Sequence, residues 1–220
     1  MKIIELKDIY FEYDREEGPV LRDFSLEEEA GEAVILRGGN GSGKTTLLRI
    51  LNGLSFPQKG SYAFKGEKID RDHLADNGRA KRFHKSVGYL FQNPDTMLFN
   101  SSVYDEIAFG PRQMGLRDEE ADRRVEDLLS LFELRDIRDR VPYHLSGGQK
   151  KLVALASVVA LDPEVLTLDE PFADLEKKRA AWLLDFLKEL KASGRTLMIA
   201  SHRDDLAGEL NGREIEMRSL

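Results

Sequence analysis

The sequence contains no cysteine among its 220 residues. This absence excludes disulfide bonds, thiolate metal sites, iron–sulfur clusters and cysteine nucleophiles, and it is typical of an intracellular protein. A long apolar run is also missing: the longest, 152–161, is interrupted by Ser157 and has about half the length that a bilayer-spanning helix needs. The first residues show no signal-peptide pattern. We therefore expect a cytoplasmic chain that reaches a membrane only through a partner.

Basic residues are fewer than acidic residues: 33 Lys and Arg against 40 Asp and Glu give a net charge of −7. Such a chain lacks the long-range attraction that a sequence-independent nucleic-acid binder uses, so we expect no nucleic-acid partner. One basic cluster is present. We interpret it as a solvated surface, because only Phe83 lies among its members; these are Arg79, Lys81, Arg82, His84 and Lys85.

The apolar residues are arranged in short runs spaced by helical pattern, which favours a mainly parallel sheet. Hydrophobic residues make up 41% of the chain, with 11 Phe and 6 Tyr, enough for one core. We expect strands at 3–10, 20–28, 33–36, 87–91, 165–168 and 196–200. Helices are expected at 45–51, 118–132 and 176–191, and the segment 93–161 is interpreted as a helical insert in the sheet domain.

A glycine-rich segment directly after the apolar run 33–36 fits the spacing Gly, four residues, Gly-Lys-Thr. Glycines permit positive φ and close approach of phosphate oxygens, and backbone N–H groups at a helix start bind anions. We predict that Lys44 reaches the β- and γ-phosphates and that the Thr45 hydroxyl binds Mg²⁺. The predicted ATP-binding residues here are Gly38, Gly39, Asn40, Gly41, Ser42, Gly43, Lys44, Thr45 and Thr46.

Two adjacent carboxylates, Asp169 and Glu170, follow the apolar run 165–168. Taken alone, two acids after a strand are usually a solvated strand end. After a phosphate loop, they predict a Mg²⁺ ligand and a residue that orients the attacking water. We therefore assign Asp169 to the metal and Glu170 as the catalytic base.

The string Leu145, Ser146, Gly147, Gly148 and Gln149 lies between the phosphate loop and the acidic strand. With those two motifs, it resembles the nucleotide-binding subunit of ATP-binding cassette (ABC) proteins. Ser146 is a suitable N-cap for a helix that continues to Leu161, and a helix N-terminus attracts anions. The resemblance implies that these five residues contact the γ-phosphate of an ATP held by a second chain.

The resemblance also implies the fold: an α/β P-loop NTPase of RecA-like type, with a mainly parallel sheet. An N-terminal antiparallel β part and an inserted α-helical subdomain complete it. Residues 1–92 and 162–220 would form the nucleotide-binding core, and 93–161 the helical subdomain that carries the signature string.

Three further positions carry roles implied by the resemblance. Tyr13 looks like the aromatic residue that stacks on adenine. Gln92 looks like the glutamine that contacts Mg²⁺ and water and hinges the helical subdomain, and His202 looks like the histidine that contacts the γ-phosphate. The implied catalytic residues are thus Glu170, His202 and Gln92; the implied metal ligands are Thr45, Gln92 and Asp169.

The sequence departs from the family pattern at three places. Glu176 stands where the family usually has Asp, and Lys151 stands where an Arg commonly follows the signature, which replaces a planar fork with a point charge. Only 18 residues follow His202. We therefore expect a minimal C-terminal dimerisation region and chain–chain contact mainly when ATP is bound.

The stretch from Phe91 to Leu116 is similar to the ATPases of energy-coupling-factor transporters, prokaryotic importers of cobalt, nickel and vitamins. Its distinctive parts are 91–95, 98–99, Val103, 107–111 and 115–116. In those ATPases this segment lies where the helical subdomain meets its membrane partner. The resemblance implies an importer subunit whose solute is selected by other chains.

We therefore expect an ATPase that dimerises on ATP, with Mg²⁺, and drives solute transport. Its expected partners are a second ATPase chain, identical or related, and integral-membrane subunits that hold it at the inner face of the cell membrane. A soluble ABC ATPase without a membrane partner, a P-loop small-molecule kinase and a non-catalytic nucleotide-binding regulator remain alternatives. Inserted coiled coils would favour the first, the signature disfavours the kinase, and the presence of Glu170 and His202 disfavours the regulator.

Overall fold

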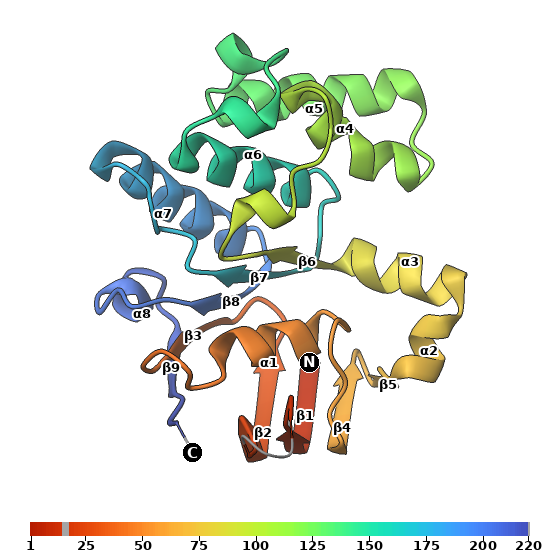
Figure 1. Ribbon diagram of the computed structural model, residues 1–220, viewed down its shortest axis with the longest axis vertical. Helices are drawn as coiled ribbons and strands as arrows, with labels where there is room; N and C mark the ends of the chain where they lie inside the picture. The colour runs from red at the N-terminus through yellow and green to blue at the C-terminus, as the bar shows by residue number, and fades with distance from the viewer. Residues whose placement is uncertain (15–17, 220) are drawn as a thin grey trace.

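Two β-sheets lie one above the other in the computed structural model, which describes residues 1–14 and 18–219 (Figure 1). Helix α1 (Lys44–Leu51) lies between the sheets. The remaining long helices cover the opposite face of the larger sheet. Among the described residues, no helix combines the length and hydropathy needed to cross a bilayer.

The larger sheet is parallel throughout. Its strand order is β6 (Val87–Leu90), β7 (Val165–Asp169), β8 (Thr196–Ala200), β3 (Ala33–Arg37) and β9 (Arg213–Glu216). The strands β3, β7 and β8 are almost entirely buried because helices or the second sheet cover both faces, which explains their continuous apolar runs. All carboxyl ends of these strands point to one edge, where α/β sheets bind their ligands.

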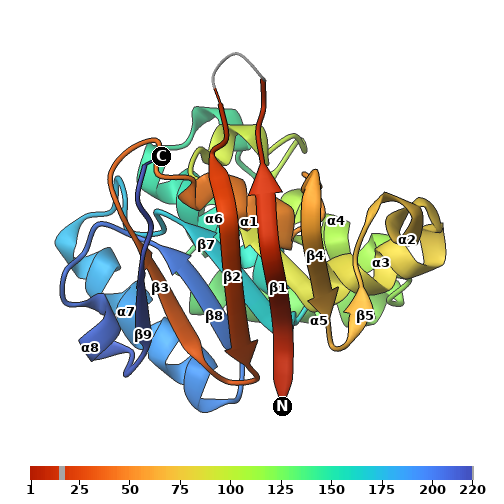
Figure 2. The ribbon, with the colours of Figure 1, turned by 90° about the horizontal axis from the view of Figure 1, so that it is seen from below.

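The smaller sheet is antiparallel, in the order β2 (Leu21–Glu29), β1 (Lys2–Phe11), β4 (Lys59–Phe64) and β5 (Glu67–Lys68). Figure 2 shows it from outside, with β1 and β2 crossing in front of the parallel sheet. Its inner face packs on α1, where Leu47, Leu48 and Leu51 have no exposed surface. Helices α2 (Arg71–Ala75) and α3 (Asn77–Ser86) project to one side and lead into β6.

Helices fill the segment between β6 and β7. The structure has α4 (Val103–Gln113), α5 (Asp118–Leu131) and α6 (Gly147–Val159), with short 3₁₀ turns at Pro94–Thr96, Arg135–Ile137 and Pro142–His144. The apolar stripe of α5, including Ala121, Val125 and Leu129, is fully buried. After β7, α7 (Lys177–Ala192) and the short α8 (Leu206–Glu209) complete this layer.

The expected α/β architecture is confirmed, including the antiparallel N-terminal part and the inserted helices. The elements β4, β5, α2, α3, α8 and β9 were not expected from the sequence. Each of them buries little: α3 has one buried residue, Phe83, and β9 has none. Without an apolar face, such elements leave no periodic signal.

Candidate nucleotide site

Four strand ends meet at a cavity of about 410 Å³. The ends of β3, β6, β7 and β8 contribute because parallel strands end at one edge of the sheet. The cavity is lined by Tyr13, Val20, Asn40, Gly41, Ser42, Gly43, Lys44, Thr45, Thr46, Gln92, Asp169, Glu170 and His202. The cavity thus brings together residues predicted to bind adenine, phosphate and metal and to catalyse hydrolysis, and the two most distant in sequence, Tyr13 and His202, are 189 positions apart.

The glycine loop after β3 adopts a conformation that other residues would not tolerate. Gly43 has φ 92° and directly precedes α1 as its N-cap residue, where it offers no side-chain cap to the N–H groups of the helix start. A Cβ on Gly38 would lie 2.2 Å from the Met217 carbonyl oxygen. Lys44 is buried and its Nζ donates to the Gly38 and Gly39 carbonyls at 2.7 and 2.9 Å. The loop therefore presents free N–H donors and a cation to the cavity.

Thr45 and Asp169 both line the cavity and place two oxygen atoms that could bind a metal ion next to each other. The Thr45 hydroxyl donates to Asp169 Oδ2 at 2.7 Å, joining α1 to the end of β7. Asp169 is 2% exposed, and burial raises the pKa of its carboxyl, against the lowering effects of the Thr45 hydroxyl and of Lys44. A carboxylate beside a hydroxyl is the ligand type that Mg²⁺ prefers.

Glu170 occupies a constrained position beside His202. Its backbone is left-handed, with φ 46°, and its N–H donates to the Ala200 carbonyl at 3.0 Å. His202 Nε2 lies 3.4 Å from Glu170 Oε1, and this buried oxygen accepts no hydrogen bond in the described chain. Burial raises the pKa of Glu170, while the nearby His202 opposes the shift. Such strain in a non-glycine residue is typical of functional sites.

The other predicted residues lie around this centre. Gln92, just after β6, also lines the cavity. Tyr13 is 58% exposed, and its ring packs edge-on against the ring of Phe11. The hydroxyl oxygens of Tyr13 and Thr46 are 3.1 Å apart and form a hydrogen bond. Two predicted ATP-binding residues, Gly38 and Gly39, are not among the described residues that line the cavity, and a Cβ on Gly39 would meet no atom within 4 Å.

The signature string lies outside this cavity, at the start of α6. Ser146 caps the helix: its hydroxyl accepts from Gln149 N–H at 3.3 Å, and Gln149 Oε1 accepts from Ser146 N–H at 3.0 Å. Leu145 is buried, whereas Ser146 and Gly147 are exposed. None of the five residues is among the described residues that line the cavity. Their helix N-terminus is therefore available to a ligand that this chain's own cavity does not hold.

The sequence did not reveal the contacts of Lys151. This side chain is 1% exposed, and its Nζ donates to the carbonyls of Gln92 and Glu170 at 2.7 and 3.3 Å. Tyr89 does not line the cavity in the described chain, but it lies near Asp169, and burial raises the pKa of its hydroxyl. Lys151 follows Lys150, and two adjacent lysines are typical of an exposed surface. The sequence therefore contains no signal that Lys151 is buried.

Comparison with known proteins agrees with this geometry. A family model described as ABC transporter matches residues 21–173. The chain is 46% identical over 200 residues to the nickel import ATP-binding protein LarO of Lactiplantibacillus plantarum, covering 91% of this chain and 82% of LarO. It is 40% identical over 208 residues to the energy-coupling factor transporter ATP-binding protein EcfA of Methanocaldococcus jannaschii, covering 94% and 72%.

Among solved structures, the chain is similar to a dimeric ATP-binding cassette, MJ0796, in a post-hydrolysis state bound to ADP and Pi. The TM-score is 0.88 at 26% sequence identity, and the match covers 98% of this chain and 96% of that one. The similarity extends through both sheets and the inserted helices, because nearly every residue of each chain is included.

Proposed function

Because this chain belongs to the ATP-binding proteins of ABC transporters, we propose that it is the ATP-hydrolysing subunit of an importer for a micronutrient, a metal ion or a vitamin. The single observation that carries the proposal is the convergence of Lys44, Asp169, Glu170 and His202 on one cavity. The names of the relatives LarO and EcfA support the importer branch. The solute itself is selected by partner chains.

ATP binding follows from the phosphate loop, and Mg²⁺ is the metal that fits its neighbours. Thr45 and Asp169 would supply oxygen ligands to the ion, with Gln92 as a third ligand. When bound, the ion neutralises charge on the β- and γ-phosphates. Lys44 and the N–H groups at the start of α1 bind the same phosphates, and Tyr13 stacks on the adenine.

Glu170 acts as the general base for hydrolysis. Its unbonded Oε1 accepts a proton from water while the water oxygen attacks the γ-phosphorus; the bond to the β,γ-bridging oxygen breaks, and ADP leaves. His202, 3.4 Å from that oxygen, orients Glu170 and contacts the γ-phosphate. Gln92, which lines the same cavity, orients the water.

A complete site requires two chains. The signature residues Leu145 to Gln149 lie outside the chain's own cavity, with an anion-binding helix start exposed. In a head-to-tail dimer, the start of α6 from one chain faces the γ-phosphate in the other. The dimeric, nucleotide-bound state of the similar cassette supports this arrangement. ATP then closes the dimer by binding the closed form best, and hydrolysis reopens it.

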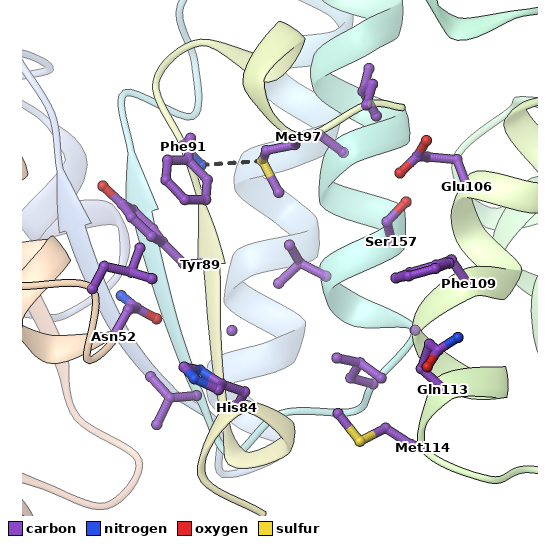
Figure 3. A pocket seen from close by; sticks show the side chains of 18 residues that line it. Asn52, His84, Tyr89, Phe91, Met97, Glu106, Phe109, Gln113, Met114 and Ser157 are labelled. Carbon is purple, nitrogen blue, oxygen red and sulfur yellow. Dashed lines mark hydrogen bonds between the residues drawn. The ribbon is translucent and has the colours of Figure 1, made fainter. Parts of the chain in front are cut away.

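A second cavity is suited to the membrane partner. It is an open, mostly apolar groove of about 350 Å³ between β6 and the helices α4 and α6. Figure 3 shows Phe91 and Met97 on one side and Phe109, Gln113 and Met114 on the other. Phe91 N–H donates to Met97 Sδ at 3.4 Å. The groove begins at the loop after β6, so a segment seated in it touches the backbone next to Gln92.

The groove has one acidic side chain among its described lining residues, Glu106, which is buried. Its Oε2 accepts the N–H groups of Phe99 and Asn100 at 2.9 and 2.8 Å and the Asn100 side-chain amide at 3.2 Å, so this carboxylate is already paired within the chain. The partner segment is therefore expected to be mainly apolar. Residues 93–161 then move as a subdomain that transmits dimer closure to the membrane subunit, which holds this chain at the inner face of the membrane.

A purification experiment tests the groove. Tagged chain isolated from membranes in mild detergent should retain an integral-membrane protein, identified by mass spectrometry. The Phe109→Asp substitution should remove that protein, because Phe109 is 42% exposed at the groove and a carboxylate there opposes apolar contact. ATP affinity, which depends on the other cavity, should be unchanged.

Leu131→Asp provides the matched control, since Leu131 is 44% exposed on α5 and does not line the groove in the described chain. It should retain the partner. Recovery of no membrane protein by the unaltered chain would favour an ABC ATPase without a membrane partner. Equal recovery by Phe109→Asp would place docking on another surface.

A further inference from the structure

Lys151 is a buried cation that contacts two functional segments at once. It lies in the second turn of α6, only five residues after the N-cap Ser146, and 1% of it is exposed. Its Nζ donates to the backbone carbonyl of Gln92 at 2.7 Å and to that of Glu170 at 3.3 Å. The side chains of Gln92 and Glu170 both line the nucleotide cavity.

Such a placement is costly without these partners. A lysine is rarely buried, and a cation near a helix N-terminus opposes the helix dipole. Burial lowers the pKa of Lys151, and the carboxylates of Asp174, Asp169 and Glu170 oppose that shift. The two carbonyls and the three nearby acids thus stabilise the ammonium group.

The two carbonyls differ in their dependence on Lys151. The Glu170 carbonyl also accepts the Ala173 N–H at 3.2 Å. The Gln92 carbonyl has no other donor in the described chain. Removing the ammonium group would therefore leave the Gln92 carbonyl unpaired and loosen the left-handed backbone of Glu170, whose φ is 46°.

We infer that Lys151 is a positioning residue for hydrolysis, which fixes the backbone of Gln92 and Glu170 relative to the signature helix. The inference rests on the proposed roles of Gln92 and Glu170. Because α6 begins with the signature, the same side chain ties a partner-facing helix start to the catalytic pair of its own chain. If dimer closure displaces α6, the hydrogen bonds of Lys151 would then transmit that displacement to the backbone of Gln92 and Glu170.

The neighbouring residue provides a contrast. Lys150 Nζ binds Asp95 Oδ1 at 2.6 Å and lies 5.3 Å from the centre of the Tyr143 ring. Asp95 belongs to the 3₁₀ turn after Gln92, and its side chain is 58% exposed. Lys150 therefore contacts the same region through the exposed carboxylate of Asp95, not through the backbone of a catalytic residue.

The test is the Lys151→Met substitution in the full chain, which keeps the side-chain length and removes the donor. Turnover (kcat) should fall about 10- to 100-fold, the loss expected for a hydrogen bond from a charged group. The equilibrium Kd for ATP should stay within about twofold, because Lys44 and Thr45 make no contact with Lys151. Lys151→Arg keeps a charged donor and should recover most of the turnover.

Lys150→Met is the control and should keep the turnover of the unaltered chain. The fluorescence of the single tryptophan, Trp182, which stacks on Phe186, reports unfolding and should show every variant to be folded under the assay conditions. An unaltered kcat in Lys151→Met, or equal losses in Lys151→Met and Lys151→Arg, would overturn the inference. Absence of ATPase activity in the unaltered chain would instead reject the proposed function.

Discussion

Replacing Glu170 with Gln should leave ATP binding intact and lower ATP turnover about 10²- to 10⁴-fold, the usual contribution of a general base. Gln has nearly the same shape, so the left-handed backbone and the contact with Ala200 should persist. What the variant lacks is an oxygen that can take a proton from water. ATP should therefore remain bound between two chains, and the dimer should accumulate. Turnover measured by phosphate release, with mass measured by light scattering, checks both effects.

Glu133→Gln is the matched control for this substitution. Glu133 also has positive φ, 54°, but it lies exposed after α5 and does not line the cavity in the described chain. It should keep most of the activity. If Glu170→Gln hydrolysed ATP at the unaltered rate, the catalytic assignment of Glu170 would be wrong.

The second large effect concerns Lys44, whose replacement by Ala should weaken ATP binding by about 100-fold or more. The side chain is buried in the loop, and Lys44 is the single lysine or arginine among the described residues that line the cavity. Loss of two or more charge-assisted hydrogen bonds to phosphate has roughly that cost. Equilibrium titration with a fluorescent ATP analogue measures it.

Lys85→Ala removes the same charge from an exposed position on α3, outside the cavity, and should bind ATP normally. Trp182 fluorescence confirms that Lys44→Ala remains folded, since Trp182 lies in the other core cluster, beside Phe132. Normal affinity in a folded Lys44→Ala protein would argue against the phosphate-loop interpretation.

The sequence predicted the strands that position the site because they are buried on both faces. Residues 33–36, 165–168 and 196–200 are continuous apolar runs, and each carries its polar site residues just beyond its end. Because parallel strands end at one edge of a sheet, a parallel sheet places Lys44, Glu170 and His202 at the same edge, and the strand order found in the structure brings them into one cavity. Antiparallel pairing of β1 and β2 followed from the family resemblance.

Elements with few buried residues could not be predicted. In β4 only Tyr62 and Phe64 are buried, and α3 buries Phe83 alone, so neither shows a sustained period. The burial of Lys151 depends on how α6 packs against two distant loop carbonyls. No local pattern in the sequence records such a contact, and the residue therefore emerged only from the structure.

The central claim, that each ATP site is made from two chains, is tested most directly by mixing two inactive variants. Lys44→Ala disables the phosphate loop. Gly147→Asp places a carboxylate at the signature helix start, where a Cβ meets only Asp174 at 3.7 Å and the fold has room for it.

Each variant alone should be inactive, because every site in its homodimer lacks one half. An equal mixture should regain activity, up to about one quarter of that of the unaltered chain, because half of the dimers are mixed and each mixed dimer holds one intact site. A mixture as inactive as its components would contradict the two-chain site.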